Sequence, residues 1–207
     1  MSIWAIVPVK PLKRAKSRLA SVLSVEEREA FSRAMLTHTL DVVAQVSDIE
    51  KILVVSRDTT VLRIAREHDA RTVTESGAPE LNAALTRAAN LATSFGAESV
   101  LVVSTDLPLM ASSDLEAMIA SANSKHNSIV IAPDHHNAST NAIFMRPPRV
   151  VPFVFGPDSF AHYTLLAKDR GIDSHVHRAH GLMLDVDTPE DLTLYHDLLK
   201  DSEGVTR

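Results

Sequence analysis

Five basic side chains lie close together near the start of the chain, and their types and spacing could serve chemistry on phosphates. They are Lys10, Lys13, Arg14, Lys16 and Arg18. No acidic residue occurs before Glu26, although the chain of 207 residues has a formal net charge of -5. Lysine binds a phosphate oxygen as a point charge, whereas arginine can bind two oxygens at once. Residues 10–18 therefore form a candidate site for a small polyanion, with a solvated basic loop as the alternative.

Two groups of aspartates could hold a metal ion beside such a polyanion. Asp106 follows the largely apolar run 99–104 after one threonine, and Asp185 and Asp187 follow a second apolar run near the end of the chain. Residues two apart in an extended segment point to the same side, so Asp185 and Asp187 could share one ion. Mg²⁺ prefers one or two carboxylates together with substrate phosphates. With the basic residues, these aspartates are sufficient for metal-assisted transfer on a nucleotide. The alternative is that Asp106 caps a turn and the D-x-D triplet is structural.

The sequence lacks the other common phosphate and metal motifs. Its six glycines form neither G-x-G-x-x-G nor G-x-x-x-x-G-K-[ST], so lysine and arginine side chains would have to bind the phosphates. The absence of cysteine excludes disulfides, thiolate metal sites and a cysteine nucleophile. The histidines at positions 135, 136, 175 and 177 do not have the spacing of a zinc site.

Apolar runs of strand length alternate with helical patterns and would position these side chains. We expect strands at residues 3–9, 51–56, 71–74, 99–104, 128–132 and 142–145, with further short runs at 174–177 and 182–186. We expect helices at residues 25–46, 59–68, 80–95, 113–122, 160–168 and 188–199, with a polar tail from residue 201. Ser24 and Ser113 each begin a capping-box pattern, and Ser159 is a candidate N-cap. This order predicts an α/β fold with three layers, αβα, around a mostly parallel sheet, with ligands outside the carboxyl ends of the strands.

The composition is that of one soluble globular domain, residues 1–207, without a repeat or a linker. Hydrophobic residues make up 45% of the chain and charged residues 23%. No apolar run approaches the roughly 20 residues that cross a bilayer, and the slightly acidic balance argues against nucleic acid as a partner. We therefore expect a cytoplasmic protein that acts on small molecules, and a homodimer is left open.

Seven short motifs, taken in their order along the chain, resemble one known family. They are Pro8-Val9-Lys10, residues 15–19, Leu81-Asn82, residues 105–109, Thr140-Asn141, residues 155–160 and residues 185–192. Together they resemble the guanylyltransferases of coenzyme F420 biosynthesis, which are related to the molybdenum-cofactor guanylyltransferases. The resemblance implies a domain of the nucleotide-diphospho-sugar transferase type (GT-A-like, Rossmann-like). It also implies transfer of GMP from GTP, with Mg²⁺, to 2-phospho-L-lactate, phosphoenolpyruvate or 3-phospho-D-glycerate, with release of pyrophosphate.

The same resemblance implies a role for each matching residue. The nucleotide-binding set would be Lys10, Lys13, Arg14, Lys16, Ser17 and Arg18 at the phosphates, to which we add Leu81 and Asn82 as the expected contact with the base or the ribose. The set that binds the phosphorylated acid would be Thr140, Asn141, Gly156 and Ser159. Asp106, Asp185 and Asp187 would bind Mg²⁺, and the catalytic residues would be Asp106, Lys16 and Lys10.

Two positions depart from the pattern of this family at the end where the acid is expected. His135 follows Asp134 where the family has arginine, and Ser139 precedes Thr140 where the family has glycine. These departures leave the identity of the acid open. Two other functions also remain open: a sugar-nucleotide enzyme that uses Asp185-Val186-Asp187 as its D-x-D metal motif, and a module that binds GTP without turnover.

Overall fold

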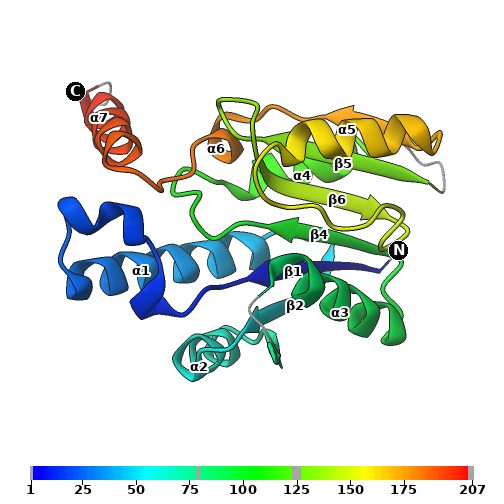
Figure 1. Ribbon diagram of the computed structural model, residues 1–207, viewed down its shortest axis with the longest axis horizontal. Coiled ribbons are helices and arrows are strands. Elements are labelled where there is room, and N and C mark those ends of the chain that lie inside the picture. The colour runs from blue at the N-terminus through cyan, green and yellow to red at the C-terminus, as the bar shows by residue number, and fades with distance from the viewer. Residues whose placement is uncertain (1, 78–79, 123–126, 205–207) are drawn as a thin grey trace.

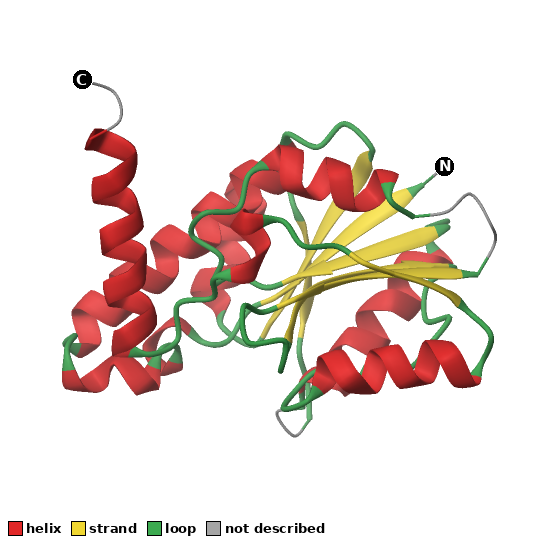
Figure 2. Cartoon of the chain, turned by 90° about the horizontal axis from the view of Figure 1, so that it is seen from above, coloured by secondary structure: helices red, strands yellow, loops and turns green. Residues whose placement is uncertain are grey.

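A sheet with helices on both faces forms the body of the protein in the computed structural model, which describes residues 2–77, 80–122 and 127–204 (Figures 1 and 2). The strands are β1 (Ile3–Pro8), β2 (Ile49–Ser56), β3 (Arg71–Thr74), β4 (Ser99–Val103), β5 (Ser128–Pro133), β6 (Thr140–Arg146) and β7 (Asp173–Val176). The α-helices are α1 (Val25–Ala44), α2 (Thr59–Glu67), α3 (Leu81–Ser94), α4 (Ser112–Ala120), α5 (Ser159–Asp169), α6 (His180–Met183) and α7 (Pro189–Gly204). The alternation of strands and helices that the sequence predicts is therefore confirmed.

The strand order across the sheet is β3-β2-β1-β4-β6-β5-β7. The pairs β1–β2, β1–β4, β2–β3 and β5–β7 are parallel, which confirms a mostly parallel sheet. Strand β6 is the exception, because it runs antiparallel to both β4 and β5. Its first residues, Thr140 and Asn141, consequently lie at the same edge of the sheet as the carboxyl ends of its neighbours.

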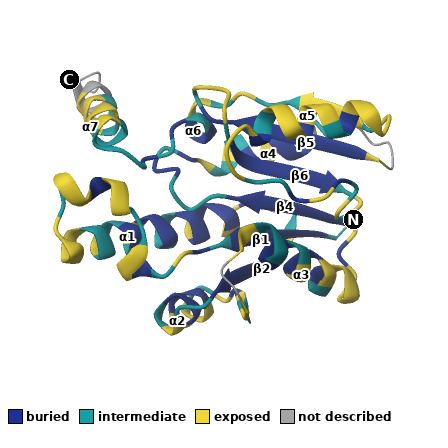
Figure 3. Cartoon of the chain, in the orientation of Figure 1, coloured by how far each residue is buried: buried dark blue, intermediate teal, exposed yellow. Residues whose placement is uncertain are grey.

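Both faces of the sheet are covered, which explains why its inner strands are continuously apolar. In β1, Ile3, Ala5 and Val7 belong to one hydrophobic cluster, while Trp4 and Ile6 belong to a second one on the opposite face. Helices α1, α2 and α4 pack on the first face, and α3 and α5 on the second. The strands are buried along most of their length, whereas the outer sides of the helices are exposed (Figure 3).

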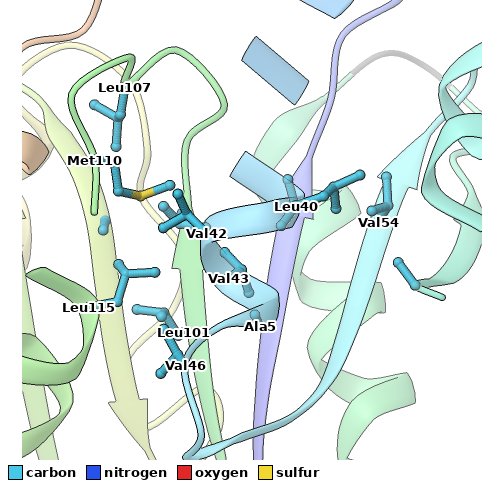
Figure 4. Close-up of a cluster of buried hydrophobic side chains, with 14 of the residues drawn as sticks. Ala5, Leu40, Val42, Val43, Val46, Val54, Leu101, Leu107, Met110 and Leu115 are labelled. Carbon is cyan, nitrogen blue, oxygen red and sulfur yellow. The ribbon is translucent and has the colours of Figure 1, made fainter. Parts of the chain in front are cut away.

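The turn after β4 is anchored in the first cluster. Leu107 and Met110 are buried there together with Val42 and Leu115 (Figure 4). Burying two apolar side chains of this size stabilises the turn by about 3–6 kcal/mol in total. The turn therefore holds Asp106, which precedes Leu107, in a fixed position at the sheet edge.

Side chains cap the starts of α1, α2 and α7, of which the one at Ser24 is predicted above. Ser24 and Glu27 form a complete capping box at α1, with Glu27 N donating to Ser24 Oγ at 3.1 Å and Ser24 N donating to Glu27 Oε2 at 2.7 Å. Asp58 Oδ1 accepts from Thr60 N at 2.8 Å at the start of α2. Thr188 and Asp191 exchange hydrogen bonds at the start of α7. Each such cap contributes about 1 kcal/mol to helix stability.

Most predicted boundaries shift by one or two residues, and three predictions need a larger correction. The capping box predicted at Ser113 is wrong, because α4 begins two residues earlier, with Ala111 as its N-cap and Asp114 Oδ2 accepting from Ala111 N at 2.9 Å. The run 182–186 is not a strand: it contains the end of α6, and its backbone bonds to Asn141 and Asp106 instead of to a neighbouring strand. Helix α7 continues to Gly204, past the predicted end at residue 199. Within the described residues, no helix is both long and apolar enough to span a membrane.

Candidate active site

A cavity of about 410 Å³ opens at the edge of the sheet where β1, β2, β3 and β4 have their carboxyl ends. The charged residues that line it include Lys10, Arg14, Lys16, Arg57, Asp106 and Asp187. Apolar side chains of Val9, Val55 and Leu81 complete much of the wall. The cavity therefore joins an apolar surface to a strongly charged one, as a site for a nucleotide would.

Lys16 is the one residue of the basic segment that the structure brings into contact with the aspartates. Its Nζ lies 3.0 Å from Asp106 Oδ2 and 2.9 Å from Asp187 Oδ1, and only 7% of its side chain is exposed. Burial alone would lower the pKa of Lys16, but the two carboxylates outweigh burial and raise it, so the side chain is an ammonium. The sequence presents five similar cations, and burial distinguishes this one.

Local structure explains why Lys16 points inward. The basic segment forms two short 3-10 helices, Leu12–Arg14 and Ser17–Ser21, and Lys16 between them has a left-handed backbone with φ of 55°. Leu12 and Leu19 are buried on either side of it. These two apolar anchors hold the ends of the segment against the protein, so that the lysine between them faces the sheet edge.

A backbone hydrogen bond holds the segment of Asp185 and Asp187 beside Asp106. Val186 N donates to Asp106 O at 3.0 Å, which fastens residues 185–187 beside the turn after β4. Asn141 Nδ2 donates to Leu182 O at 3.0 Å and to Asp185 Oδ1 at 3.3 Å. Asn141 therefore holds Asp185 in place; its predicted contact with the acid stays a prediction.

The electrostatics of the three aspartates fit a divalent cation. Burial, and then the charge of Asp106, raise the pKa of Asp185 to about 6. Burial also opposes ionisation of Asp106, but Lys16 outweighs it and holds the pKa of Asp106 below its ordinary value. Lys16 contacts two of the three carboxylates, those of Asp106 and Asp187, and the buried Asp106 Oδ1 has no hydrogen-bond partner within the described residues. An unpartnered carboxylate oxygen among carboxylates is a suitable ligand for Mg²⁺.

This acidic group is not a closed metal cage. Among the parts of the chain that the structure describes, no three acidic or histidine side chains gather closely enough to surround an ion by themselves. Mg²⁺ sites in enzymes commonly take their remaining ligands from water and substrate phosphates. The donor set fits that pattern.

The residues predicted to bind the acid lie together at the start of β6 and α5. Ser159 Oγ donates to Thr140 Oγ1 at 3.2 Å, and both side chains are buried. Ser159 is the first residue of α5 and not its N-cap, so that alternative is wrong; Asp158 holds the N-cap position. Gly156, whose φ is 136°, accepts from Ser159 N at 3.2 Å. A non-glycine residue at this φ would be strained.

Asn82, at the start of α3, is hydrogen-bonded to the segment that leads into α5. Its Nδ2 donates to Phe155 O at 3.1 Å, and its Oδ1 accepts from Phe155 N at 2.8 Å. The side chain at the start of α3 thereby holds the segment that contains Gly156. A direct contact between Asn82 and a nucleotide stays a prediction.

The other residues predicted to bind the nucleotide fall into two groups, those that line the cavity and those that do not. Lys10, Arg14 and Leu81 line the cavity, whereas Lys13, Ser17 and Arg18 are exposed and are not part of its lining.

Asp134, at one of the two departures from the family pattern, is buried and accepts from Ala138 N at 2.8 Å and from Ser139 N at 3.1 Å. It organises the turn between β5 and β6.

Sequence reasoning missed Arg57 and Glu75, which also line the cavity. A signal for both was present, because each is a charged residue directly after a predicted strand, at the edge where ligands of such sheets bind. Neither belongs to a recognisable motif.

The fold and this site define a class of protein. The structure is similar to that of a protein from Desulfovibrio desulfuricans G20 named as a nucleotide-diphospho-sugar transferase, with a TM-score of 0.77 over 94% of this chain and 87% of that one. At 16% identity this similarity shows the fold alone. The chain therefore has an α/β fold of the nucleotide-diphospho-sugar transferase type, with a charged cavity at the carboxyl ends of its strands.

Sequence comparison shows the particular family. Residues 3–202 match the family described as "Guanylyl transferase CofC like", and the chain belongs to it. The chain is 32% identical to the phosphoenolpyruvate guanylyltransferase of Conexibacter woesei, over 99% of this chain and 92% of that protein. It is 33% identical to the 2-phospho-L-lactate guanylyltransferase of Methanothermobacter thermautotrophicus, over 93% and 83%. The resemblance found in the sequence motifs is confirmed.

Proposed function

We propose that this enzyme transfers GMP from GTP to a small phosphorylated carboxylic acid and releases pyrophosphate, as a step of coenzyme F420 biosynthesis. The observation that carries the proposal is the contact of Lys16 with Asp106 and Asp187 inside a cavity large enough for a nucleotide. Phosphoenolpyruvate and 2-phospho-L-lactate are the acids in the names of the relatives, and 3-phospho-D-glycerate is the third candidate.

The chemistry needs no covalent enzyme intermediate. An oxygen of the acid's phosphate attacks the α-phosphorus of GTP, a new P–O bond forms, and the bond from that phosphorus to the bridging oxygen breaks. The bond electrons leave with pyrophosphate. A phosphate monoester is largely dianionic at neutral pH, so no residue has to remove a proton from it. The main obstacle is the repulsion between two polyanions.

The residues of this chain would act by position and charge. Lys16, with Lys10 and Arg14 on the cavity wall, would stabilise the charge that develops on the departing pyrophosphate. Thr140 and Ser159, with the backbone amides at the start of α5, would hold the acid. Mg²⁺, held by Asp106, Asp185 and Asp187, would neutralise phosphate oxygens of both reactants.

One incubation tests this function. The protein is mixed with GTP, MgCl₂ and each of the three acids in turn, and the products are identified by mass together with released pyrophosphate. We expect a guanylylated acid from one of them, and at least about a thousandfold less from Asp106→Asn, because that variant loses the charge of a partly buried carboxylate at the proposed reacting centre. Asp197→Asn, on the exposed surface of α7, is the matched control.

The same assay separates the alternatives. Guanylylation of sugar phosphates in place of the acids would indicate the sugar-nucleotide enzyme. Binding of GTP with Mg²⁺ but no pyrophosphate from any acceptor would indicate a sensing module. Either result would contradict the proposal. The cytoplasmic location, the lack of a nucleic-acid partner and a homodimer stay predictions from the sequence.

A further inference from the structure

The cavity extends further along the sheet edge than the phosphates require. Lys16, Asp106 and Asp187 gather at the ends of β1 and β4, while Arg57 follows β2 and Glu75 follows β3. Neighbouring strands are about 4.8 Å apart, so the strand ends from β4 to β3 span roughly 14 Å. With the phosphates at the β1–β4 end, the base of a nucleotide would lie toward Arg57 and Glu75.

Glu75 is held rigidly at this distant end. Arg57 Nε donates to Glu75 Oε2 at 3.1 Å, and Arg57 Nη2 lies 3.0 Å from Glu75 Oε1. Glu75 N also donates to Ser56 O at 2.9 Å, which continues the β2–β3 pairing beyond β3. The side chain of Glu75 is only 15% exposed. A carboxylate fixed in this way has a defined direction, unlike a surface glutamate.

The carboxylate of Glu75 retains capacity for a ligand. The hydrogen bonds from Arg57 hold its pKa below the ordinary value, so it is ionised at neutral pH. An ionised carboxylate can accept about four hydrogen bonds. Arg57 already occupies one position on each oxygen of Glu75, and Glu80 N donates to Oε1 at 3.4 Å, so about one position remains, on Oε2. Glu80, the other glutamate on the cavity wall, is already engaged, because its two oxygens accept from Asn82 N at 2.9 Å and Ala83 N at 2.6 Å to cap α3.

Apolar side chains border the same end of the cavity. Val55, Leu81 and Ala84 line it, and Leu81 is 42% exposed although it is a leucine. A flat base against such a wall presents its hydrogen-bonding edge to the charged residues. Guanine has two donors side by side on that edge, N1–H and the 2-amino group, whereas adenine has an acceptor at N1 and no 2-amino group.

We propose that Glu75 Oε2, held in place by Arg57, accepts a hydrogen bond from N1–H of guanine and so selects GTP over ATP. This inference rests on the proposed function for the position of the phosphates. It assigns a binding role to the Arg57–Glu75 ion pair and places base selection on the edge strand of the sheet, away from the reacting centre.

Equilibrium binding of GTP, ITP and ATP, with Mg²⁺ and without an acid, tests the inference. Inosine lacks only the 2-amino group, and adenine lacks both donors. We expect the wild-type protein to bind GTP and ITP at least about tenfold more tightly than ATP, because adenine places an acceptor and not a donor against the charged Glu75 carboxylate. Glu75→Gln should lower the affinities for GTP and ITP at least about tenfold and change the affinity for ATP by less than about twofold.

The matched control is Glu67→Gln, which breaks the exposed ion pair of Arg63 and Glu67 on α2, and it should leave all three affinities unchanged. Equal losses for all three nucleotides in Glu75→Gln, or unchanged GTP binding, would overturn the inference. If Glu75→Gln does not fold, binding of 1-methyl-GTP to the wild-type protein tests the inference. An affinity at least tenfold weaker than that for GTP supports the inference, and an equal affinity overturns it. Selective GTP binding without transfer to any acid would refute the proposed function and leave this inference standing. Guanylyl transfer with unchanged selectivity in Glu75→Gln would support the proposed function and refute this inference.

Discussion

The two sides of the active site are built on different principles. On the side that we propose binds the nucleotide, charged residues surround an open cavity, and several of them, such as Lys10 and Arg14, are exposed. On the side that we propose binds the acid, neutral side chains are buried and hydrogen-bonded: Ser159 to Thr140, and Asn141 to the backbone of residue 182. The difference suggests that charge compensation governs binding of the triphosphate and that fixed geometry governs binding of the smaller acid.

Replacing Lys16 should have the largest effect on both stability and activity. Removing one partner of a buried ion pair costs about 3–5 kcal/mol, because the other charge is left uncompensated. Since Asp187 is partly exposed, we expect Lys16→Ala to lower the free energy of unfolding by about 3 kcal/mol in EDTA. Guanylyl transfer should fall at least about a hundredfold.

Chemical unfolding and pyrophosphate release measure the two effects of Lys16→Ala, with Lys51→Ala on the exposed part of β2 as the control. Added Mg²⁺ should restore part of the stability, because it supplies positive charge to the same aspartates. A variant as stable as the wild type in EDTA would refute a compensating role for Lys16.

Asp185 lies between the two sides and gives a pH test. Its pKa is raised to about 6 in the folded protein from an ordinary value of 3.8. Stability is therefore lost as the pH rises through this interval and stays low above it, by about 2–3 kcal/mol. Asp185→Asn should accordingly stabilise the magnesium-free protein by about this amount at pH 8 and by little at pH 4.

Urea unfolding in EDTA at the two pH values measures the difference for Asp185→Asn, and Asp197→Asn is the control. The same variant should lose transfer activity, since it replaces a proposed metal ligand. An equal change in stability at both pH values would mean that burial of this carboxylate is not what raises its pKa.

Asn82 tests whether the two sides are mechanically joined. Asn82→Ala removes two hydrogen bonds and leaves the Phe155 N–H and C=O without their partner, which should cost about 2 kcal/mol. Because Phe155 precedes Gly156, we expect the KM values of both GTP and the acid to rise. Steady-state kinetics of Asn82→Ala and of Asn90→Ala, on the exposed side of α3, provide the comparison. A rise in one KM only would show that the sides are independent.

Ser159 should give the smallest effect and the sharpest contrast. Ser159→Ala removes its hydrogen bond to Thr140, worth about 1 kcal/mol, so the KM of the acid should rise about fivefold while the KM of GTP stays unchanged. Thr164→Ala in the same helix is the control, because its hydroxyl bonds only to the backbone of Phe160. An increase in the KM of GTP would contradict the division between the two sides.

Much of this site could be predicted because local sequence controls it. Asp106 follows a fully apolar strand, and the carboxyl ends of parallel strands meet at one edge, so its meeting with the basic segment follows from the pattern. Asn141 could not be assigned its role in the same way. Its partners are the carbonyls of residues 182 and 183 and the side chain of Asp185, which are remote in sequence.

The sequence by itself determined the α/β fold, the family and the charged groups that meet, because apolar periodicity and the order of motifs are local properties. Only the tertiary structure decided which of five cations is buried, that β6 runs antiparallel and brings Thr140 to the site, and that Glu75 reaches the cavity from the edge strand. The physical reason is that burial and pairing depend on neighbours that are distant along the chain, and these neighbours set the charge state and the direction of each side chain.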